Sequence, residues 1–362
     1  MVDVLVIGAG AAGVAAARAA HEAGASVCVV ADGGGAAALG SGVVWGVARD
    51  PFVRWAAEGR AWRVGGRYVT TAGWLLEGAV GALSSLLDLS SLPAHGTPGV
   101  LAIPGHPAWS ATLVAQSLGA RVVEAPTGSV EGATLREVAA RLDLDGAAEA
   151  FAHALAPRCE GLSALLLPPV LGLARGDVAE RIAAVLRMPV GETAGVPGDA
   201  PGVRVTKALR AWLPPSVEVL RGRATVRPEG PSGVRLEGGR ELRARSVVLC
   251  TGGLLGGGLA FGASLHEATA GAPVWTRDRR RVLVDGGSAR GADPAEWFDE
   301  HTGRARGAGV RVDARGRVVG ADGTTPLAPW LHAAGEVCCA PHEGLADTLA
   351  DGARTGRSAA ER

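Results

Sequence analysis

A glycine-rich turn near the start of the chain constrains its fold more than any other feature. The apolar run Val4–Ile7 leads directly into the six residues Gly8 to Gly13, which open an alanine-rich segment that we expect to be helical to about Ala23. A continuous apolar run is typical of a parallel strand buried on both faces. Gly24 then ends the helix, and Ser26–Val30 supplies a second strand. The pattern predicts a complete βαβ unit.

Each glycine of this turn has its own physical role. Gly8 permits a tight turn, Gly10 lets the backbone approach a pyrophosphate, and Gly13 lets the helix pack closely against the strand. The helix N-terminus adds free N–H groups and a positive dipole end. The residues that we expect to bind the pyrophosphate of an FAD-like cofactor are Gly8, Ala9, Gly10, Ala11, Ala12 and Gly13. The alternative is a glycine-rich turn in an unrelated α/β protein.

The residue that normally contacts the adenosine ribose departs from the usual pattern. Folds of this kind place an acidic side chain after the second strand. Here Ala31 stands at that position and Asp32 follows it. Either Asp32 contacts the ribose from a shifted position, or the contact is lost, which would suit FMN or weaker binding of FAD. The sequence leaves both interpretations open.

A second glycine-rich segment, residues 33–46, follows the βαβ unit and contains Gly40, Ser41 and Gly42. Successive backbone N–H groups in such a loop form a concave site for anions. We expect this loop to wrap the pyrophosphate and the flavin edge, and a flexible surface loop is the alternative.

The C-terminal part of the chain carries a second flavin signature. Ser246–Cys250 predicts a buried strand that stops at Thr251-Gly252, a turn expected near the cofactor. Residues 331–337 predict a strand that ends in Gly335-Glu336, and residues 344–360 predict a helix with small residues on one face. We expect Glu336 to accept hydrogen bonds from the ribityl hydroxyls. The helix that begins at Gly344 and Leu345 would direct its positive end toward the flavin.

The chain length predicts two domains, because 362 residues exceed what a single hydrophobic core comfortably fills. We expect an α/β, Rossmann-like two-dinucleotide-binding-domain flavoprotein with an inserted α/β cap domain. The flavin-binding domain would comprise residues 1–50, 215–262 and 308–362, and the cap would comprise residues 51–214 and 263–307.

Within the inserted region, hydrophobic periodicity predicts a series of strands and helices. Strands are expected at 99–103, 121–124 and 162–167, and helices at 110–118, 134–142, 147–155, 177–186 and 206–212. Turn signals at 228–230, 237–239 and 314–316 predict hairpins on either side of the second flavin signature.

Composition excludes several classes of function. The 36 basic and 36 acidic side chains cancel, which leaves no field that would recruit nucleic acid or anionic lipid. The five cysteines lack the spacing of a zinc site or an iron–sulfur cluster, so we expect no metal and buried thiols in a reducing compartment. We expect no signal peptide, because Met1-Val2-Asp3 leads directly into the first strand, and the apolar run 75–89 is too short to span a bilayer. The expected location is the cytoplasm, peripheral to the membrane only through partner subunits.

Several further segments resemble one flavoprotein family. They are the Gly40–Gly42 loop, residues 167–173 (LPPVLGL), Glu192, residues 201–204 with Lys207, residues 251–259 (TGGLLGGGL) and residues 333–337 (AAGEV). Together they resemble the B subunit of the anaerobic glycerol-3-phosphate dehydrogenase, within the FAD-dependent fumarate reductase and succinate dehydrogenase superfamily. The loss of the ribose acid at Ala31 fits this family, whereas residues 197–202 depart from its PPSVPG stretch and the chain is rather short for it.

This resemblance implies one component of a quinone-linked complex that oxidises sn-glycerol 3-phosphate to dihydroxyacetone phosphate. Its partners would be a catalytic flavoprotein subunit and an iron–sulfur subunit, with no nucleic acid and no direct membrane insertion. The cofactor would be FAD, or FMN, and the chain would hold it and relay electrons. The alternatives are a free-standing FAD-dependent oxidoreductase that acts on a small acid or amine, and a flavin-free scaffold subunit.

Catalytic candidates are few. His342 and Glu343 lie just past the Gly335-Glu336 turn, where they would transfer protons beside the flavin or simply cap the last helix. Other charged candidates are His106, Arg204 and His266, of which His266 is expected at the surface. Adjacent Cys338 and Cys339 cannot easily form a relaxed disulfide with each other, although one of them could flank the flavin as a redox thiol.

Overall fold

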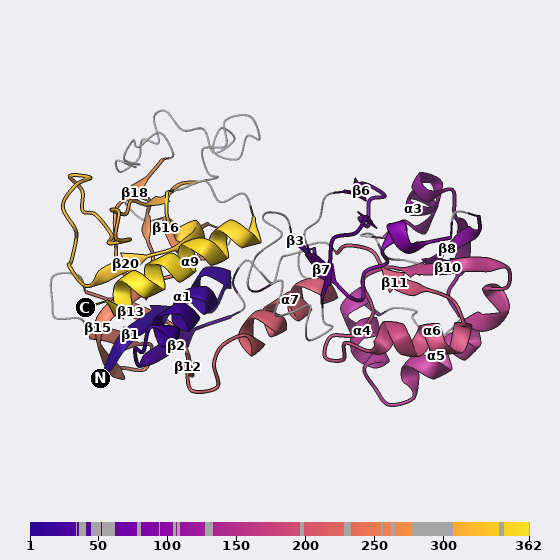
Figure 1. Ribbon diagram of the computed structural model, residues 1–362, viewed down its shortest axis with the longest axis horizontal. Coiled ribbons are helices and arrows are strands. Elements are labelled where there is room, and N and C mark those ends of the chain that lie inside the picture. The colour runs from indigo at the N-terminus through magenta and orange to yellow at the C-terminus, as the bar shows by residue number, and fades with distance from the viewer. Residues whose placement is uncertain are drawn as a thin grey trace. The chain divides into compact units, whose positions relative to one another are not determined.

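The computed structural model divides the chain into two compact units, residues 1–37 with 209–362, and residues 38–208 (Figure 1). The residues that it describes are 1–33, 35, 41–44, 52, 62–77, 81–93, 95–103, 106, 109–126, 133–195, 199–227, 233–254, 256–261, 265–276, 307–339 and 344–361. The two units are taken in turn.

The first unit is built on a seven-stranded sheet with the order β12-β2-β1-β15-β14-β13, to which β20 adds beside β15. Its central strands are parallel. The strands are β1 (Val2–Ile7), β2 (Val27–Ala31), β12 (Glu218–Arg221), β13 (Ala224–Val226), β14 (Gly233–Leu236), β15 (Glu241–Leu249) and β20 (Leu331–Ala333). The expected βαβ unit is therefore confirmed, with helix α1 (Ala11–Glu22) between β1 and β2.

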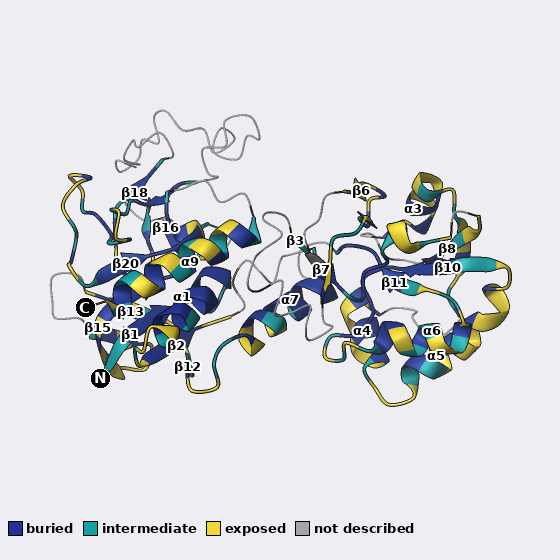
Figure 2. Ribbon diagram, in the orientation of Figure 1, coloured by how far each residue is buried: buried dark blue, intermediate teal, exposed yellow. Residues whose placement is uncertain are grey.

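Alternate residues of β1 are buried on opposite faces of this sheet. Leu5 and Ile7 join one apolar cluster, and Val4 and Val6 join another that includes the alanines of α1. Figure 2 shows these central strands and α1 as almost entirely buried. The continuous apolar run at residues 4–7 thus reflects a strand covered on both sides.

Strand β15 belongs to two kinds of pairing. Its first residues pair antiparallel with β14, and its last residues run parallel to β1 and β20. The β14–β15 hairpin confirms the expected turn at 237–239. Strands β13 and β14 pair antiparallel, and the turn expected between them at 228–230 lies outside the described residues. Beyond β15 lie two short pairs, β16 (Leu259–Phe261) with β17 (Leu265–Glu267), and β18 (Val274–Trp275) with β19 (Gly309–Val310).

Helix α9 (Leu345–Ala360) packs directly on α1, and the two lie side by side in Figure 1. A side chain at Gly352 would overlap the carbonyl oxygen of Ala12, and one at Gly356 would overlap that of Ala16. The small-residue face expected for this helix is therefore confirmed. Its glycines lie on the side that faces α1 and let the two helix backbones come into contact. The packing ties the C-terminal helix to the helix of the glycine turn.

The second unit contains a four-stranded parallel sheet with the order β11-β10-β8-β9. Its strands are β8 (Thr97–Ala102), β9 (Arg121–Glu124), β10 (Leu162–Leu167) and β11 (Val190–Glu192). Its helices are α3 (Ala111–Leu118), α4 (Leu135–Leu142), α5 (Ala147–Leu155), α6 (Val178–Leu186) and most of α7 (Ala200–Ala211), whose last residues, from 209 on, belong to the first unit. The one-turn helices η2 (Leu89–Ser91) and η3 (Ala156–Arg158) also belong to the second unit. One apolar core joins this sheet to its helices.

Small antiparallel sheets complete the second unit. One has the order β3-β7-β4, from β3 (Val43–Val44), β7 (Gly81–Leu83) and β4 (Trp62–Val64). The other is a hairpin of β5 (Tyr68–Val69) and β6 (Leu75–Leu76). The expected strands and helices of the inserted region are confirmed, except that α7 begins at Ala200, six residues before the expected start, with Pro201 in its first turn where proline is tolerated.

The division into units differs from the expected domain boundaries in three places. Residues 38–50 belong to the second unit, and residues 209–214 belong to the first. The described residues of the segment 263–307 do not join the cap as we expected. Leu265, Ala270, Ala272 and Val274 instead pack in the first unit with Val247 and Leu249 of β15.

Candidate functional site

The glycine turn has the close packing that its spacing predicts. Gly8 adopts φ 110°, and a side chain there would overlap the carbonyl oxygen of Cys250, the residue that follows β15. A side chain at Gly13 would overlap the Gly8 carbonyl oxygen. These two glycines are therefore required for the turn to lie against the neighbouring strand end.

The N-terminus of α1 presents free donors beside this turn. Gly10 is the N-cap and no side chain caps the helix. Among the described residues, no acceptor binds the backbone N–H groups of Ala11, Ala12 or Gly13. Within the described ranges, a Cβ at Gly10 would meet only the Cα of Gly35, at 3.9 Å. This arrangement fits a pyrophosphate, because free N–H groups and a positive helix end favour an anion.

A second turn closes on α1 from the C-terminal half of the chain. Gly335 adopts φ 80°, and a Cβ there would lie 2.5 Å from the Cβ of Ala12. The strand expected over 331–337 ends earlier, at Ala333. The left-handed conformation of Gly335 turns the chain there into the one-turn helix η4 (Gly335–Val337). Glu336 is exposed, so its carboxylate can meet a ligand.

Asp351 of α9 fixes this second turn, although no pattern in the sequence pointed to it. Its Oδ2 accepts a hydrogen bond from the Gly335 N–H at 2.8 Å, and its Oδ1 lies 2.5 Å from Arg354 Nη2. Helix α9 begins at Leu345 with Gly344 as its N-cap, as expected. The candidates His342 and Glu343 lie outside the described residues, and their assignment stays a prediction.

The Thr251-Gly252 turn meets the Gly335-Glu336 turn. Gly252 adopts φ 83°, and a Cβ on the next residue, Gly253, would lie 3.1 Å from the Glu336 carbonyl oxygen. Two segments that are distant in the sequence are thus adjacent at the carboxyl ends of β15 and β20. Ligands bind in α/β sheets outside the carboxyl ends of their strands.

Ala31 and Asp32 lie at the end of β2, where folds of this kind usually contact a ribose. Ala31 is the buried last residue of β2, and Asp32 follows it with its carboxylate 2.8 Å from Arg223 Nε. Both partners are largely in solvent, with side chains 43% and 76% exposed, so this ion pair is weak. The assignment of Asp32 to a ribose contact stays a prediction.

Of the loop residues expected to wrap the cofactor, Ser41 and Gly42 belong to the second unit and Gly40 lies outside the described residues. The Ser41 carbonyl accepts a hydrogen bond from the Gly195 N–H at 3.0 Å. A Cβ at Gly42 would lie 2.9 Å from Leu83 and 3.1 Å from Pro201. The assignment of these residues to the cofactor stays a prediction.

Comparison with known proteins identifies the glycine turn. Residues 3–73 match the FAD binding domain family. The chain contains an FAD-binding domain. The matched segment holds the βαβ unit, with the free N–H groups of α1 and Asp32 after β2. No curated protein matches the chain.

Solved structures with detectable similarity include two ketosteroid dehydrogenases and a fumarate reductase. The 3-ketosteroid-Δ4-(5α)-dehydrogenase of Rhodococcus jostii RHA1 has 16% identity and a TM-score of 0.38, with 100% of this chain and 97% of that chain covered. A flavocytochrome c3 fumarate reductase has 14% identity and a TM-score of 0.38, with 99% and 78% covered. The 3-ketosteroid Δ1-dehydrogenase of Sterolibacterium denitrificans has 12% identity and a TM-score of 0.35, with 99% and 98% covered.

In the second unit, the segments that carried the family resemblance are bonded to one another. Arg204 of α7 forms a buried ion pair with Glu192 and donates to the carbonyl oxygens of Leu171 and Gly172, both at 2.6 Å. Glu192 also accepts from the Leu171 N–H at 2.9 Å and from the Ser85 hydroxyl at 2.8 Å. Burial lowers the pKa of Arg204 to about 10, which leaves it charged at neutral pH. Its described contacts are those of a structural residue.

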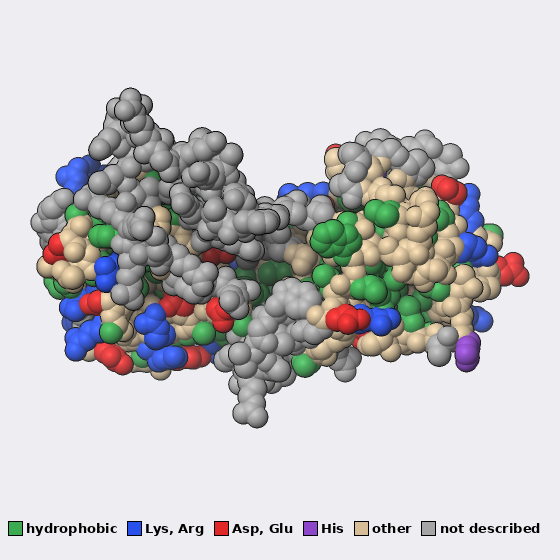
Figure 3. Space-filling model, turned by 90° about the horizontal axis from the view of Figure 1, so that it is seen from above, with side chains coloured by type: hydrophobic (Ala, Val, Ile, Leu, Met, Phe, Trp, Pro, Cys, Tyr) green, Lys and Arg blue, Asp and Glu red, His purple; other side chains and the backbone are tan. Residues whose placement is uncertain are grey.

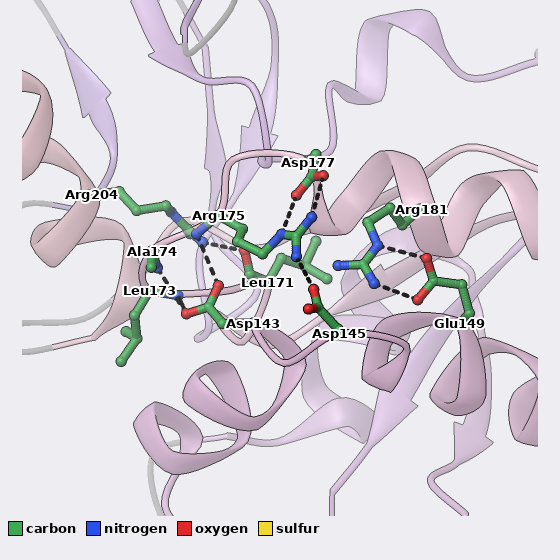
Figure 4. Close-up of polar contacts among 10 residues, drawn as sticks. All are labelled: Asp143, Asp145, Glu149, Leu171, Leu173, Ala174, Arg175, Asp177, Arg181 and Arg204. Carbon is green, nitrogen blue, oxygen red and sulfur yellow. Dashed lines mark hydrogen bonds and ion pairs between the residues drawn. The ribbon is translucent and has the colours of Figure 1, made fainter.

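The loop after β10 is held from its other side by Asp143. Figure 4 shows this carboxylate receiving the backbone N–H groups of Leu173 and Ala174, at 2.9 and 2.8 Å, and Arg175 N donates to it at 2.9 Å. Arg175 in turn binds Asp145 and Asp177 through its guanidinium (Figure 4). Residues 167–173, which contributed to the family resemblance, thus lead into a loop whose conformation is fixed by hydrogen bonds to Asp143.

The remaining candidates have partners in the fold. His106 lies 2.5 Å from the Ala133 carbonyl oxygen through its Nε2. His266, expected at the surface, is half-buried in β17. Cys28, Cys159, Cys250 and Cys338 are buried, and burial raises the pKa of the Cys338 thiol well above its usual range, which disfavours a redox thiolate there.

The described part of the chain contains neither a metal site nor a membrane-spanning helix. No group of three or more of its His, Cys, Asp or Glu side chains is placed to hold a metal ion. None of the helices described is both long and apolar enough to cross a bilayer.

Proposed function

We propose that this protein is an FAD-dependent oxidoreductase. The observation that carries the proposal is the open cradle at the N-terminus of α1, within a segment that matches the FAD binding domain family. The N–H groups of Ala11, Ala12 and Gly13 would hold the pyrophosphate, Asp32 the ribose, and Glu336 the ribityl hydroxyls. When bound, FAD accepts two electrons from a substrate and passes them to an acceptor.

The finer proposal is the B subunit of a quinone-linked glycerol-3-phosphate dehydrogenase, which holds flavin and relays electrons. It is supported by the family-like segments of the second unit, since residues 167–173, Glu192, Arg204 and Lys207 form one bonded network. In the reaction the secondary alcohol of sn-glycerol 3-phosphate loses two electrons and two protons, and a quinone receives them.

The partner subunits are part of this proposal, and exposed apolar side chains of the second unit support it. Figure 3 shows hydrophobic side chains gathered on the face of this unit that is turned to the viewer. Trp74 and Leu75 are 75% and 47% exposed, and Leu113 of α3 is 46% exposed. A Cβ at Gly73 would lie 3.4 Å from the Leu113 carbonyl oxygen, so the segment that carries Trp74 lies close to α3. Contiguous apolar patches mark protein interfaces.

The test is to release and identify the cofactor, and then to isolate the protein through a tag from its native cells. Released FAD, with co-purification of a second flavoprotein and an iron–sulfur protein, would support both levels of the proposal. FAD in a chain that purifies alone and oxidises a small acid or amine would favour the free-standing oxidoreductase. A chain that takes up neither FAD nor FMN would contradict the proposal and leave a flavin-free scaffold.

A further inference from the structure

A fully buried carboxyl group lies behind the Thr251-Gly252 turn. Glu267, the last residue of β17, is 0% exposed. Its Oε1 accepts a hydrogen bond from the Thr251 hydroxyl at 3.0 Å. Its Oε2 accepts from the backbone N–H groups of Thr269 and Ala270, at 3.0 and 2.6 Å. A buried carboxyl group is costly unless hydrogen bonds satisfy it, so a specific role is expected for this one.

The contacts around Glu267 lead directly to the flavin site. The Ala268 N–H donates to the Gly258 carbonyl oxygen at 2.9 Å, which holds the β16–β17 hairpin in place. A Cβ at Gly258 would lie 2.7 Å from Thr251 Oγ1, and would overlap the Gly252 carbonyl oxygen. The hairpin is therefore pressed against the same turn that meets Glu336 through Gly253.

We propose that Glu267 is a positioning residue of the flavin site, which fixes the direction of the Thr251 hydroxyl. While Glu267 is ionised it only accepts hydrogen bonds, so in that state the Thr251 hydroxyl donates its single proton to Glu267. The hydroxyl oxygen then presents only its acceptor lone pairs to the cofactor side of the turn. This inference rests on the proposed binding of FAD, and it assigns a role to a residue outside the expected site.

The substitution Glu267→Gln reverses this one hydrogen bond. The glutamine amide oxygen has to face the N–H donors of Thr269 and Ala270, so its NH2 group faces Thr251. The hydroxyl then accepts from Gln and turns its own proton toward the cofactor side. Since one hydrogen bond is altered, we expect roughly 2- to 10-fold weaker FAD binding and a shifted flavin absorption spectrum, in a variant that folds normally.

Variants of Thr251 show whether Glu267 acts through it. Thr251→Ser keeps the hydroxyl and should bind FAD as the unaltered protein does, whereas Thr251→Val removes it and should weaken FAD to a similar extent. In the Thr251→Val background, Glu267→Gln should have no further effect on FAD affinity or spectrum. These readouts need only the bound cofactor, so they do not depend on the substrate.

The outcomes separate the two proposals. Failure of the unaltered protein to bind FAD would contradict the proposed function itself. If it binds FAD, three results would overturn the positioning role alone: an unchanged spectrum and affinity in Glu267→Gln, an equal effect of Glu267→Gln with and without the Thr251 hydroxyl, or normal FAD binding by Thr251→Val. If Glu267→Gln does not fold, the Thr251→Ser and Thr251→Val pair still decides the question.

Discussion

Gly352 lies directly against the carbonyl oxygen of Ala12, with no room between them for a side chain. This contact joins the C-terminal helix α9 to the first turn of α1, whose N–H groups form the proposed pyrophosphate site. Gly335, which lies against the Ala12 Cβ, adds a second close approach at the same place. The cradle therefore depends on backbone contacts between both ends of the discontinuous first unit.

Gly352→Ala is expected to destabilise the first unit by about 1–3 kcal/mol, because the added methyl group has to push the two helices apart. Thermal unfolding followed by circular dichroism measures the loss. Gly176→Ala is the matched control, since a Cβ there meets nothing within 4 Å. A Gly352→Ala protein as stable as this control would contradict the close packing of α9 on α1.

Gly10→Ala separates cofactor binding from folding. Within the described part of the chain, a Cβ at position 10 has only the Gly35 Cα as a neighbour, at 3.9 Å, so the unliganded protein should keep its stability. The methyl group would occupy the approach to the pyrophosphate, so FAD should bind at least about tenfold more weakly, or roughly 1.4 kcal/mol. Isothermal titration with FAD measures this. Gly13→Ala is the contrasting variant and should fail to fold normally, because its methyl group overlaps the Gly8 carbonyl oxygen.

Asp32→Ala tests the shifted ribose contact. We expect FAD to bind about 10- to 100-fold more weakly, as for one lost hydrogen bond to a charged group. FMN lacks the adenosine half, so its dissociation constant should not change. An equal loss for FAD and FMN would mean that Asp32 acts on the fold, and no loss for either would mean that the ribose contact is absent.

Arg204→Met is expected to destabilise the second unit by about 3–5 kcal/mol, because it leaves the buried Glu192 carboxylate without its cation. The double variant Glu192→Gln/Arg204→Met removes that charge and should recover part of the loss. Arg181→Met is the control: it breaks the partly exposed ion pair with Glu149, which is worth no more than about 1 kcal/mol. Urea unfolding measures all three, and similar losses for Arg204→Met and Arg181→Met would contradict the expectation.

Stability should also depend on pH through Glu267. Burial raises the pKa of this carboxyl above its unfolded value, so the folded protein binds the proton more tightly. That contribution is fully present below about pH 4.5 and is lost as pH rises through the folded pKa. Glu267→Gln does not titrate, so its stability relative to the unaltered protein should increase over the same rise. The control is Glu137→Gln, whose difference should have the opposite sign, because hydrogen bonds from Thr134 lower the Glu137 pKa. A difference for Glu267→Gln that is constant with pH would contradict the expectation.

Local patterns predicted most of the fold. The βαβ unit at residues 4–30, the strands of the inserted region and the final helix follow from hydrophobic period and glycine position, which act within a few residues. The turns of the second flavin signature were also visible in the sequence. Their meeting at Gly253 and Glu336 depends on the parallel pairing of β15 with β20, which joins distant parts of the chain.

Contacts between distant residues explain what the sequence did not reveal. Glu267 stands in a short segment without clear periodicity, and its partner Thr251 is on another strand end. The segment that contains Glu267 was assigned to the cap because nothing local shows that Leu265 and Val274 pack against β15. In the sequence, Asp351 cannot be distinguished from any other acidic residue of an amphipathic helix. The structure shows that its carboxylate accepts a hydrogen bond from the Gly335 N–H.

The discontinuity of the first unit has a consequence for the order in which the protein is made. The second unit is a continuous stretch, residues 38–208, so a ribosome completes it while the first unit still has only β1, α1 and β2. The neighbours of β1 and α1, namely β15 and α9, are translated later. Flavin insertion must therefore wait until translation has passed residue 360, and the unpaired edge of β1 has to be kept from aggregation until then.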